Sequence, residues 1–296
     1  MNDRDAIAWL PAALLEHAVA YETKAAFDAD RAGRSEHYGA QWREGIDAVR
    51  SGGDGGVAGC CPLCEARSCF VSFDRHAPTP SLREGLVCTG CRTNARVRAG
   101  LSMLAALCPD RNASIYITEQ VSAGYRWLRG RYRSAIGSEF ARGWWHRATL
   151  TFRLWWRRTP GHVRFEDVTR LRFADASMHA VVSFDVLEHV PDYRAALREF
   201  ARVTATNGWL VLTVPFTGAE RGLERARKLE DGRIEHLQPA EFHGDPLGAG
   251  VLCFHYFGWD ALDDLRSAGY RHAAVVMPWW PEAGLFDGLA TIVAQR

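Results

Sequence analysis

Four cysteines are spaced as two CxxC pairs, Cys61-x-x-Cys64 and Cys88-x-x-Cys91, with 23 residues between the pairs. Such pairs are typical of a tetrahedral Zn²⁺ site with four thiolate ligands. Four protein ligands leave no open coordination position, so we expect a structural zinc rather than a catalytic one. Cys60 offers an alternative register with Cys64. A redox role would need only one CxxC pair, next to a βαβ unit.

Acidic residues form a second group that can do chemistry. Glu119, Glu139, Asp167 and Asp185 each follow a short apolar run with the pattern of a buried strand. A carboxylate accepts hydrogen bonds from hydroxyl and amino groups of a ligand. One such acid is as readily a helix N-cap or a solvated loop residue. Four acids at successive strand ends indicate a shared ligand-binding rim.

Histidines supply the candidate catalytic residues. His189 follows the strand-like run that ends at Asp185, and His236 and His243 lie in a later loop that is dense in histidines and acids. Each can act as a general base that removes a proton from an acceptor. The alternative for His189 is a structural hydrogen bond at the start of a helix. For the loop, the alternatives are structuring hydrogen bonds or a second metal held by His236, His243, Asp245 and His255.

Strands and helices alternate around these residues. Apolar strand patterns occur at 114–118, 134–140, 162–168, 179–186, 209–216, 272–278 and 289–295. Amphipathic helical patterns lie between most of them, as in 191–205, which has a proline in its first turn. This alternation predicts an α/β fold with a seven-stranded, mostly parallel sheet covered by helices on both faces. Ligands bind such sheets at the carboxyl ends of the strands, where the acids fall.

The composition narrows the class of protein. The chain has 296 residues, a formal net charge of +1, 47% hydrophobic residues and 24% charged residues, which is the balance of a soluble globular protein. The neutral charge argues against nucleic acid as a partner. No apolar run reaches the roughly 20 residues of a membrane span, and the N-terminus has no secretory pattern. We therefore expect a cytoplasmic protein with reduced cysteines.

The stretch VRFEDVTRLRFADASMHAVVSFDVLEHVPDYRAALREFARVTATNGWLVLTVPF, residues 163–216, resembles the class I methyltransferases that use S-adenosylmethionine, in particular their type-11-like group. The resemblance extends over about 112–296. It implies a Rossmann-like fold with S-adenosylmethionine as cofactor and S-adenosylhomocysteine as product. By the same resemblance, Glu139 holds the ribose, Asp167 bonds the adenine amino group, and Phe184 and Asp185 line the methyl-donor pocket. Val168, next to Asp167, is also assigned to the cofactor site.

The first strand departs from the pattern of this family. Glu119 stands where the family often has an acid, but of the usual glycine-rich turn only Gly124 is present. Either Ser122 and Ala123 form a tighter turn here, or cofactor binding is altered. We assign Glu119 and Gly124 to the cofactor site. A nicotinamide cofactor would need a GxGxxG motif after this strand, which is absent.

The sequence patterns divide the chain into three expected segments. We expect an N-terminal helical segment at 1–58, a zinc ribbon at 59–94 and the methyltransferase domain at 95–296. Residues 140–162 and 217–257 are expected to be insertions near the acceptor site. The Trp- and Arg-rich segment 140–162 could contact a membrane surface, cover the acceptor site as a lid, or pack on the N-terminal helices. Packing or a lid is favoured because tryptophan buries a large area.

The predicted activity is in-line methyl transfer to a small-molecule acceptor, as O- or N-methylation of a metabolite, sugar or natural product. Two alternatives stay open. A zinc-ribbon RNA methyltransferase would bind RNA with a strong salt dependence. A non-catalytic Rossmann-like binding module would not bind the cofactor. The pattern leaves open the acceptor, the use of a general base, the oligomeric state and the role of 1–58.

Overall fold

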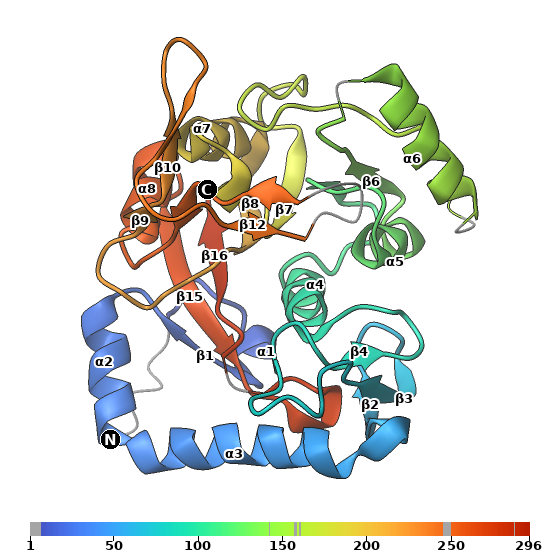
Figure 1. Cartoon of the computed structure of the whole chain (residues 1–296), viewed down its shortest axis with the longest axis vertical. Helices are drawn as coiled ribbons and strands as arrows, with labels where there is room; N and C mark the ends of the chain where they lie inside the picture. Colours follow the sequence, from blue (N-terminus) through green and yellow to red (C-terminus); the bar gives the residue numbers. More distant parts are fainter. Residues whose placement is uncertain (1–6, 142, 157–158, 160, 245–249, 287) are drawn as a thin grey trace.

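A seven-stranded sheet forms the centre of the chain (Figure 1). The computed structural model describes residues 7–141, 143–156, 159, 161–244, 250–286 and 288–296. The sheet contains β1 (Ala18–Tyr21), β5 (Ser114–Ile117), β6 (Ser134–Gly137), β7 (Met178–Phe184), β8 (Thr204–Thr213), β15 (His272–Pro278) and β16 (Thr291–Gln295). Their order is β1-β15-β16-β8-β7-β5-β6. β6, β5, β7, β8 and β15 run in one direction, and β1 and β16 run the other way, which confirms the predicted α/β fold class.

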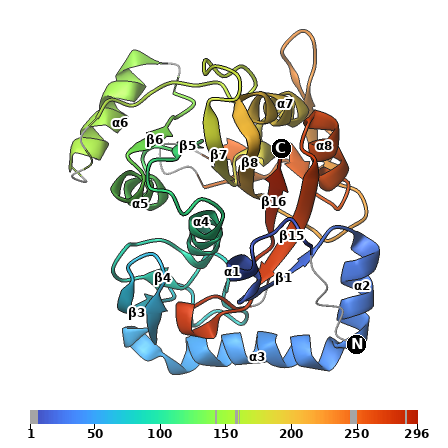
Figure 2. The same ribbon diagram turned by 180° about the vertical axis from the view of Figure 1, so that it is seen from behind.

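Both faces of the sheet are covered by helices, which explains the nearly continuous apolar strands. Successive residues of β5 point to opposite faces: Ile115 and Ile117 join one buried cluster, and Tyr116 joins the other. The first cluster includes residues of α4 and α5, and the second includes residues of α7 and α8 (Figures 1 and 2). These helices are α4 (Ala95–Leu107), α5 (Ala123–Arg131), α7 (Tyr193–Val203) and α8 (Ala261–Ala268).

Side-chain caps fix where the helices near the candidate site begin. Asn94 accepts a hydrogen bond from the backbone N–H of Val97 and starts α4, three residues after Cys91. Ser122 caps α5 in the same way, three residues after Glu119. Each cap satisfies a backbone donor that would otherwise have no partner in the first turn. The two caps therefore fix α4 relative to the second CxxC pair, and α5 relative to the end of β5.

The cysteine-rich segment forms a small antiparallel sheet with the order β2-β3-β4. Its strands are β2 (Val57–Cys61), β3 (Ala66–Val71) and β4 (Val87–Cys88). Figure 1 shows this ribbon at one end of α3, below α4 and away from β7 and β8. The segment expected to be a zinc ribbon thus forms a small antiparallel sheet, and its metal stays a prediction.

The N-terminal segment is helical only in part. It contains α1 (Ala12–Leu15), α2 (Lys24–Gly33), α3 (Ser35–Ser51) and the 3₁₀ turn η1 (Gly53–Gly55), but also β1. The expectation of an all-helical segment over 1–58 is therefore wrong at β1. This strand pairs antiparallel with the edge of β15, with Ala18 opposite Pro278 and Tyr21 opposite Val275. An open strand edge offers backbone partners, and tertiary pairing of this kind overrides local helix propensity.

The expected strand at 162–168 is also reduced. Only one parallel bridge forms there, between Glu139 and Phe165. The segment has a charged residue on both sides of Phe165, and Glu166 turns inward to an ion pair with Arg172 instead of continuing a ladder. The predicted boundaries at residues 58 and 94 remain predictions.

Two excursions lie outside the sheet. The first carries α6 (Trp144–Trp156), which lies beyond α5 and β6 at the margin of the molecule (Figure 1). The second forms three two-stranded sheets, β10-β11, β12-β13 and β14-β9. Their strands are β9 (Leu223–Glu224), β10 (Ala226–Lys228), β11 (Ile234–His236), β12 (Phe242–His243), β13 (Val251–Leu252) and β14 (His255–Tyr256). The 3₁₀ turns η2 (Leu187–His189) and η3 (Pro281–Ala283) complete the described elements.

Candidate functional site

The thiols of Cys61, Cys64, Cys88 and Cys91 converge on one point in the ribbon. The Sγ atoms of Cys61 and Cys91 lie 3.8 Å apart, as do those of Cys64 and Cys88, and all four lie within 4.8 Å of one another. Four sulfurs around a tetrahedral Zn²⁺, with Zn–S bonds of about 2.3 Å, are about 3.8 Å apart. Gly90 makes this approach feasible, because a Cβ there would lie 2.9 Å from the Sγ of Cys64. The four residues have the geometry of a closed thiolate site.

The alternative pairing, in which Cys60 replaces Cys61 as a partner of Cys64, is not formed in the described residues. Cys60 is exposed, and Cys69 is partly buried in β3; neither belongs to the group of converging ligand atoms. The cysteine pairs expected from the spacing are thus the ones that the fold brings together.

A fully buried arginine joins the ribbon to the main sheet. Arg98 in α4 donates hydrogen bonds to the carbonyl oxygens of Leu86 and Thr93 in the ribbon, and to those of Ala283 and Gly284 after β15. A buried guanidinium is tolerable only when such acceptors surround it. The ribbon is therefore fixed to the sheet domain rather than carried on a flexible linker.

The carboxyl end of β7 is covered by arginines from outside the sheet. Asp185 is partly buried, and its Oδ1 accepts hydrogen bonds from Arg83, at 2.7 Å, and from the hydroxyl of Thr213, at 2.9 Å. The Nε of Arg96 lies 3.2 Å from its Oδ2 and 2.8 Å from Glu84. Asp185 has φ of 48°, a conformation that few residues other than glycine adopt and that is concentrated at functional sites.

The loop after β5 is organised by two carboxylates. Oε1 of Glu139 accepts hydrogen bonds from the backbone N–H groups of Gln120 and Val121, at 2.8 and 2.7 Å. Glu119 accepts one from the hydroxyl of Ser122 at 2.8 Å. Burial and the nearby Glu139 carboxylate raise the pKa of Glu119 to about 7, against the lowering effect of Ser122. Glu119 and Glu139 thus hold the turn between β5 and α5.

An open pocket of about 390 Å³ lies at the end of β5, and its size falls in the range of small-ligand sites. One wall comes from the ribbon and the start of α4, and the other comes from the loop between β5 and α5. The lining residues are Phe73, Glu84, Val87, Arg92, Thr93, Asn94, Val97, Glu119, Ser122, Ala123 and Gly124. A Cβ at Gly124 would lie 2.9 Å from Oε1 of Glu119, so glycine keeps this turn tight. Two expected cofactor residues, Glu119 and Gly124, line this pocket.

Three other expected cofactor residues have local partners. Asp167 accepts hydrogen bonds from the backbone N–H and the hydroxyl of Thr169, at 3.0 and 2.7 Å. Val168 is partly buried against the cluster on the α7 face of the sheet. The Phe184 ring is buried against α4, where a Cβ at Gly100 would lie 2.4 Å from it. Phe184 therefore contributes to the packing of α4 on the sheet.

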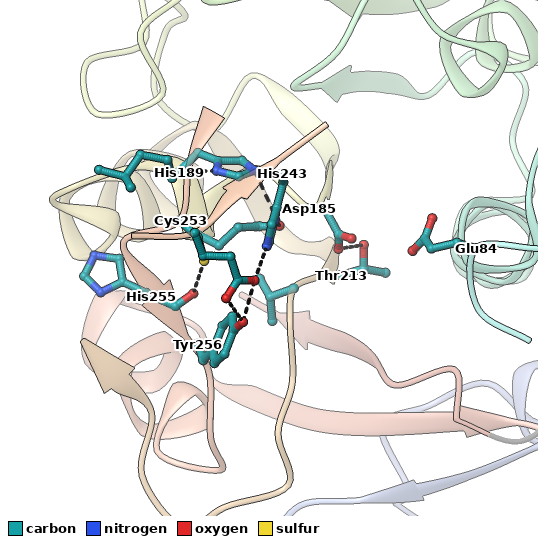
Figure 3. Close-up of polar contacts among 12 residues, drawn as sticks. Glu84, Asp185, His189, Thr213, His243, Cys253, His255 and Tyr256 are labelled. Atoms are coloured by element: carbon teal, nitrogen blue, oxygen red, sulfur yellow. Dashed lines mark hydrogen bonds and ion pairs between the residues drawn. The ribbon is translucent and has the colours of Figure 1, made fainter. Parts of the chain in front are cut away.

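Two of the expected catalytic histidines meet around a carboxylate. The Nε2 of His189 and the Nδ1 of His243 each lie 3.9 Å from Oε1 of Glu188. The opposite nitrogens are hydrogen bonded, Nδ1 of His189 to the carbonyl oxygen of Leu252 at 2.9 Å and Nε2 of His243 to Glu241 at 3.0 Å. Figure 3 shows the two histidines side by side, from different segments of the chain.

Glu188 is fully buried, and in the part of the chain that the structure describes its carboxylate oxygens have no hydrogen-bond partner. Burial, followed by the charge of Asp185, raises the pKa of Glu188 to about 8. The backbone around it is firmly held, because its carbonyl oxygen accepts a hydrogen bond from Phe254 at 2.7 Å. Uncompensated buried carboxylates are costly, and they cluster at functional sites.

The third expected catalytic histidine does not join this group. His236 is exposed in β11, opposite Ala226 in β10, and its ligand atoms are outside the converging set. His255 is buried, with Nε2 at 3.1 Å from the carbonyl oxygen of Pro191, and burial lowers its pKa. Asp245 lies outside the described residues. Of the four residues considered from the sequence for a second metal, only His243 belongs to a group of converging ligand atoms among the described residues.

The aromatic residues of α6 face outward. Exposed side chains on or next to this helix are Phe140, Trp144, Trp145, Phe152, Trp155 and Trp156. Only Leu150 and Leu154 of α6 are buried, in a small cluster that includes Val163. The expectation that the tryptophans are buried by packing is wrong for the described residues. Contact with a membrane surface through 140–162 stays a prediction.

Sequence reasoning missed several residues of the site. No local pattern in the sequence indicates that Arg83 and Arg96 pair with Asp185, or that Glu241 contacts His243. Glu188, next to His189 in the sequence, is a further residue whose burial no local pattern indicates. The signal that could have found it is the adjacent Glu–His pair directly after a buried strand.

Residues 126–212 match the type 11 family model described as "Methyltransferase domain". The match spans α5 to β8 and confirms the resemblance read from the sequence. A search of curated proteins gave no match. Among the helices of the described residues, none has the length and apolar character needed to cross a bilayer.

Several solved structures are similar in fold. One is an S-adenosylmethionine dependent methyltransferase from Mesorhizobium loti, with 17% identity over 70% of this chain and 100% of that chain, at a TM-score of 0.47. Another is 1,6-didemethyltoxoflavin-N1-methyltransferase from Burkholderia thailandensis, with 18% identity over 68% and 78% of the two chains, at 0.41. The YcgJ protein from Bacillus subtilis is 20% identical over 40% of this chain and 50% of its own, at 0.33.

Proposed function

We propose that this chain, which carries a class I methyltransferase domain, transfers a methyl group from S-adenosylmethionine to a small-molecule acceptor, and that its ribbon holds a structural Zn²⁺. The observation that carries the proposal is the pocket at the carboxyl end of β5, lined by Glu119 and Gly124. It lies where α/β sheets of this topology bind ligands. S-adenosylmethionine, when bound, supplies an activated methyl group on a cationic sulfonium centre.

The residues present fit a cationic cofactor. Glu119 is a partly buried carboxyl whose pKa is raised to about 7, chiefly by desolvation, and a cation nearby would favour its charged form. Glu139 follows β6, and Asp167 follows the bridge that Phe165 makes with Glu139. The resemblance assigns the ribose to Glu139 and the adenine to Asp167. Asp185 is held in position by Arg83 and Arg96. These contacts orient the carboxylate of Asp185 at the rim.

The acceptor side lies beyond Asp185, where His189 and His243 come together. Imidazoles can take a proton from a hydroxyl or an ammonium acceptor. Since His236 is exposed on a separate hairpin, we propose only His189 and His243 as catalytic candidates. A small acceptor is favoured over RNA because the two rim arginines are paired with Glu84 and Asp185 rather than presented to phosphates.

Calorimetry with S-adenosylmethionine and S-adenosylhomocysteine tests the proposal. We expect micromolar binding to the zinc-loaded wild type and at least tenfold weaker binding for Glu139→Ala and Asp167→Ala, since each change removes hydrogen bonds to a charged acceptor. Asp231→Ala, an acid on an exposed hairpin, is the matched control and should bind like wild type. No binding to folded wild type would favour the non-catalytic module.

A second assay separates the two enzyme classes. Release of S-adenosylhomocysteine is followed with a panel of hydroxyl and amine acceptors, and RNA binding is measured at several salt concentrations. We expect turnover with a small acceptor and only weak RNA affinity. Tight RNA binding with a steep salt dependence would instead support the RNA methyltransferase.

A further inference from the structure

The cluster of Glu188, His189 and His243 has the composition and the surroundings of a metal site. Their ligand atoms lie within 4.8 Å of one another, and both histidine nitrogens that face the carboxylate are 3.9 Å from Oε1. Ligands of a tetrahedral ion with bonds of about 2.05 Å are roughly 3.3 Å apart. Small side-chain rotations would close the difference. The buried carboxylate, which has no hydrogen-bond partner in the described residues, is aimed into this space.

The outer contacts of the two histidines have the arrangement found around metal ligands. A metal-bound histidine usually donates its other ring N–H to a carbonyl or a carboxylate, which fixes the tautomer and aims the remaining nitrogen at the metal. His189 makes this contact with the carbonyl oxygen of Leu252, and His243 makes it with the carboxylate of Glu241. Both contacts leave the other nitrogen directed toward Glu188.

Glu241 is itself held by further contacts. It accepts a hydrogen bond from the hydroxyl of Tyr256 at 2.6 Å and pairs with Arg225 at 3.0 Å. In Figure 3, Tyr256 lies below the two histidines, and Asp185 lies between them and Glu84. Glu241 thus holds His243, and Tyr256 and Arg225 in turn hold Glu241. This second layer of contacts is more than a loop needs to keep its shape.

We propose that Glu188, His189 and His243 form a second metal site, distinct from the four-cysteine site, that binds a divalent transition-metal ion such as Zn²⁺, Co²⁺ or Mn²⁺. Two imidazoles and one carboxylate suit these ions better than Mg²⁺ or Ca²⁺, which prefer oxygen ligands. Three protein ligands leave at least one position open for an oxygen ligand. The metal site does not depend on methyl transfer itself, although an occupied site would make His189 and His243 metal ligands in place of the proton acceptors proposed above. Only the use of the open position by an acceptor oxygen rests on the proposed function.

The test uses Co²⁺ on full-length protein whose ribbon is already loaded with one equivalent of Zn²⁺. Cobalt bound by nitrogen and oxygen gives weak d–d absorption bands, whereas cobalt bound by thiolates adds intense charge-transfer bands. We expect one further equivalent of Co²⁺ after gel filtration, with d–d bands and no thiolate bands. Charge-transfer bands with loss of zinc, or no retained cobalt, would overturn the proposal.

Variants locate the ion. Glu188→Gln keeps the side-chain shape, and His243→Ala removes one ligand; each should lower cobalt affinity at least 100-fold while zinc content and thermal unfolding show an intact fold. Glu241→Gln should weaken binding by about 10- to 100-fold, because it removes an outer-shell contact. His236→Ala, an exposed histidine of the same excursion, is the control and should bind like wild type. Equal binding by wild type and Glu188→Gln would place the cobalt elsewhere.

The open position is tested separately with acetohydroxamate, a small ligand that binds metals through oxygen. Its addition should shift the d–d bands while the cobalt content after gel filtration stays unchanged. Unshifted bands would show a closed site. Because none of these measurements involves S-adenosylmethionine, they can succeed or fail independently of the methyltransferase assays.

Discussion

The Nη2 of Arg83 lies 2.7 Å from Oδ1 of Asp185, although the two residues are 102 positions apart in the chain. Arg83 precedes β4 in the ribbon, and Asp185 follows β7 of the main sheet. Burial acts to raise the pKa of Asp185, but the guanidinium groups of Arg96 and Arg83 outweigh it, so the pKa lies below its usual range. The ribbon therefore supplies part of the charge balance at the rim of the candidate cofactor site.

Removing one of these guanidinium groups should destabilise the protein. Arg96→Met leaves the partly buried carboxylate of Asp185 with one cationic partner instead of two, and we expect a loss of about 2 kcal/mol in the free energy of unfolding, below the 3–5 kcal/mol seen when a buried charge loses its only partner. Chemical denaturation of the zinc-loaded protein measures this loss. The control is Arg227→Met, which breaks an exposed pair with Glu235 and should change the free energy of unfolding far less. Equal effects of the two variants would contradict a structural role for the rim pairs.

Removal of the ribbon zinc should weaken cofactor binding as well as stability. The pocket wall formed by Arg92, Thr93 and Asn94 begins directly after Cys91, so loss of the thiolate site frees that wall. Cys88→Ser should lose the metal, and Gly90→Ala should weaken its binding, because a Cβ there meets the Sγ of Cys64 at 2.9 Å. Elemental analysis, thermal unfolding and calorimetry with S-adenosylhomocysteine check these changes.

The matched control for the zinc prediction is Cys69→Ser. Cys69 lies in β3 of the same ribbon, but its sulfur is outside the converging group. It should keep the zinc content of the wild type and wild-type affinity for the cofactor product. A zinc-free Cys88→Ser protein with unchanged stability and binding would show that the ribbon is independent of the pocket.

The sequence was sufficient where one local pattern decides the structure. The run over 179–186 is apolar because both faces of β7 are covered, and the strand forms at Met178–Phe184. The CxxC spacing was also sufficient, since each pair sits on a tight turn. β1 could not be predicted, because its four residues become a strand only through the exposed edge of β15.

The site was less predictable, because its contacts join distant segments. The positions of Glu119 and Asp185 at strand ends follow from the topology, but their partners do not. Nothing in the chain near His189 indicates that His243 will lie beside it, since this depends on how the excursion after β8 folds back through the pairing of Leu252 and Phe254 with η2. The burial of Glu188 depends on the same packing.

The pKa of Glu119 predicts how pH affects both stability and binding. Its value of about 7 in the folded chain lies above the ordinary 4.5, so between these values the folded state holds a proton that the unfolded state has lost. The contribution of this group to stability is therefore present below pH 4.5 and is lost as the pH rises through 7. A cationic cofactor has the opposite preference, because it binds better to the ionised carboxylate.

We therefore expect affinity for S-adenosylmethionine to rise by up to about tenfold between pH 6 and pH 8. Glu119→Gln should bind more weakly at pH 8 and lose most of this pH dependence. Calorimetry at several pH values, in buffers with different heats of ionisation, also measures the proton released on binding. The same slope in wild type and in Glu119→Gln would assign the pH dependence to another group.

The exposed tryptophans of α6 lead to a prediction that contrasts two kinds of apolar residue in one helix. Trp155 and Trp156 are 72% and 81% exposed, so replacing both by alanine removes little buried area and should change the free energy of unfolding by less than about 0.5 kcal/mol. Leu154→Ala, at a residue that is 2% exposed, should cost about 2–5 kcal/mol if α6 unfolds together with the domain. Denaturation followed by circular dichroism compares the variants. A large loss from the tryptophan changes would mean that these rings are buried against another part of the chain, as the sequence first led us to expect.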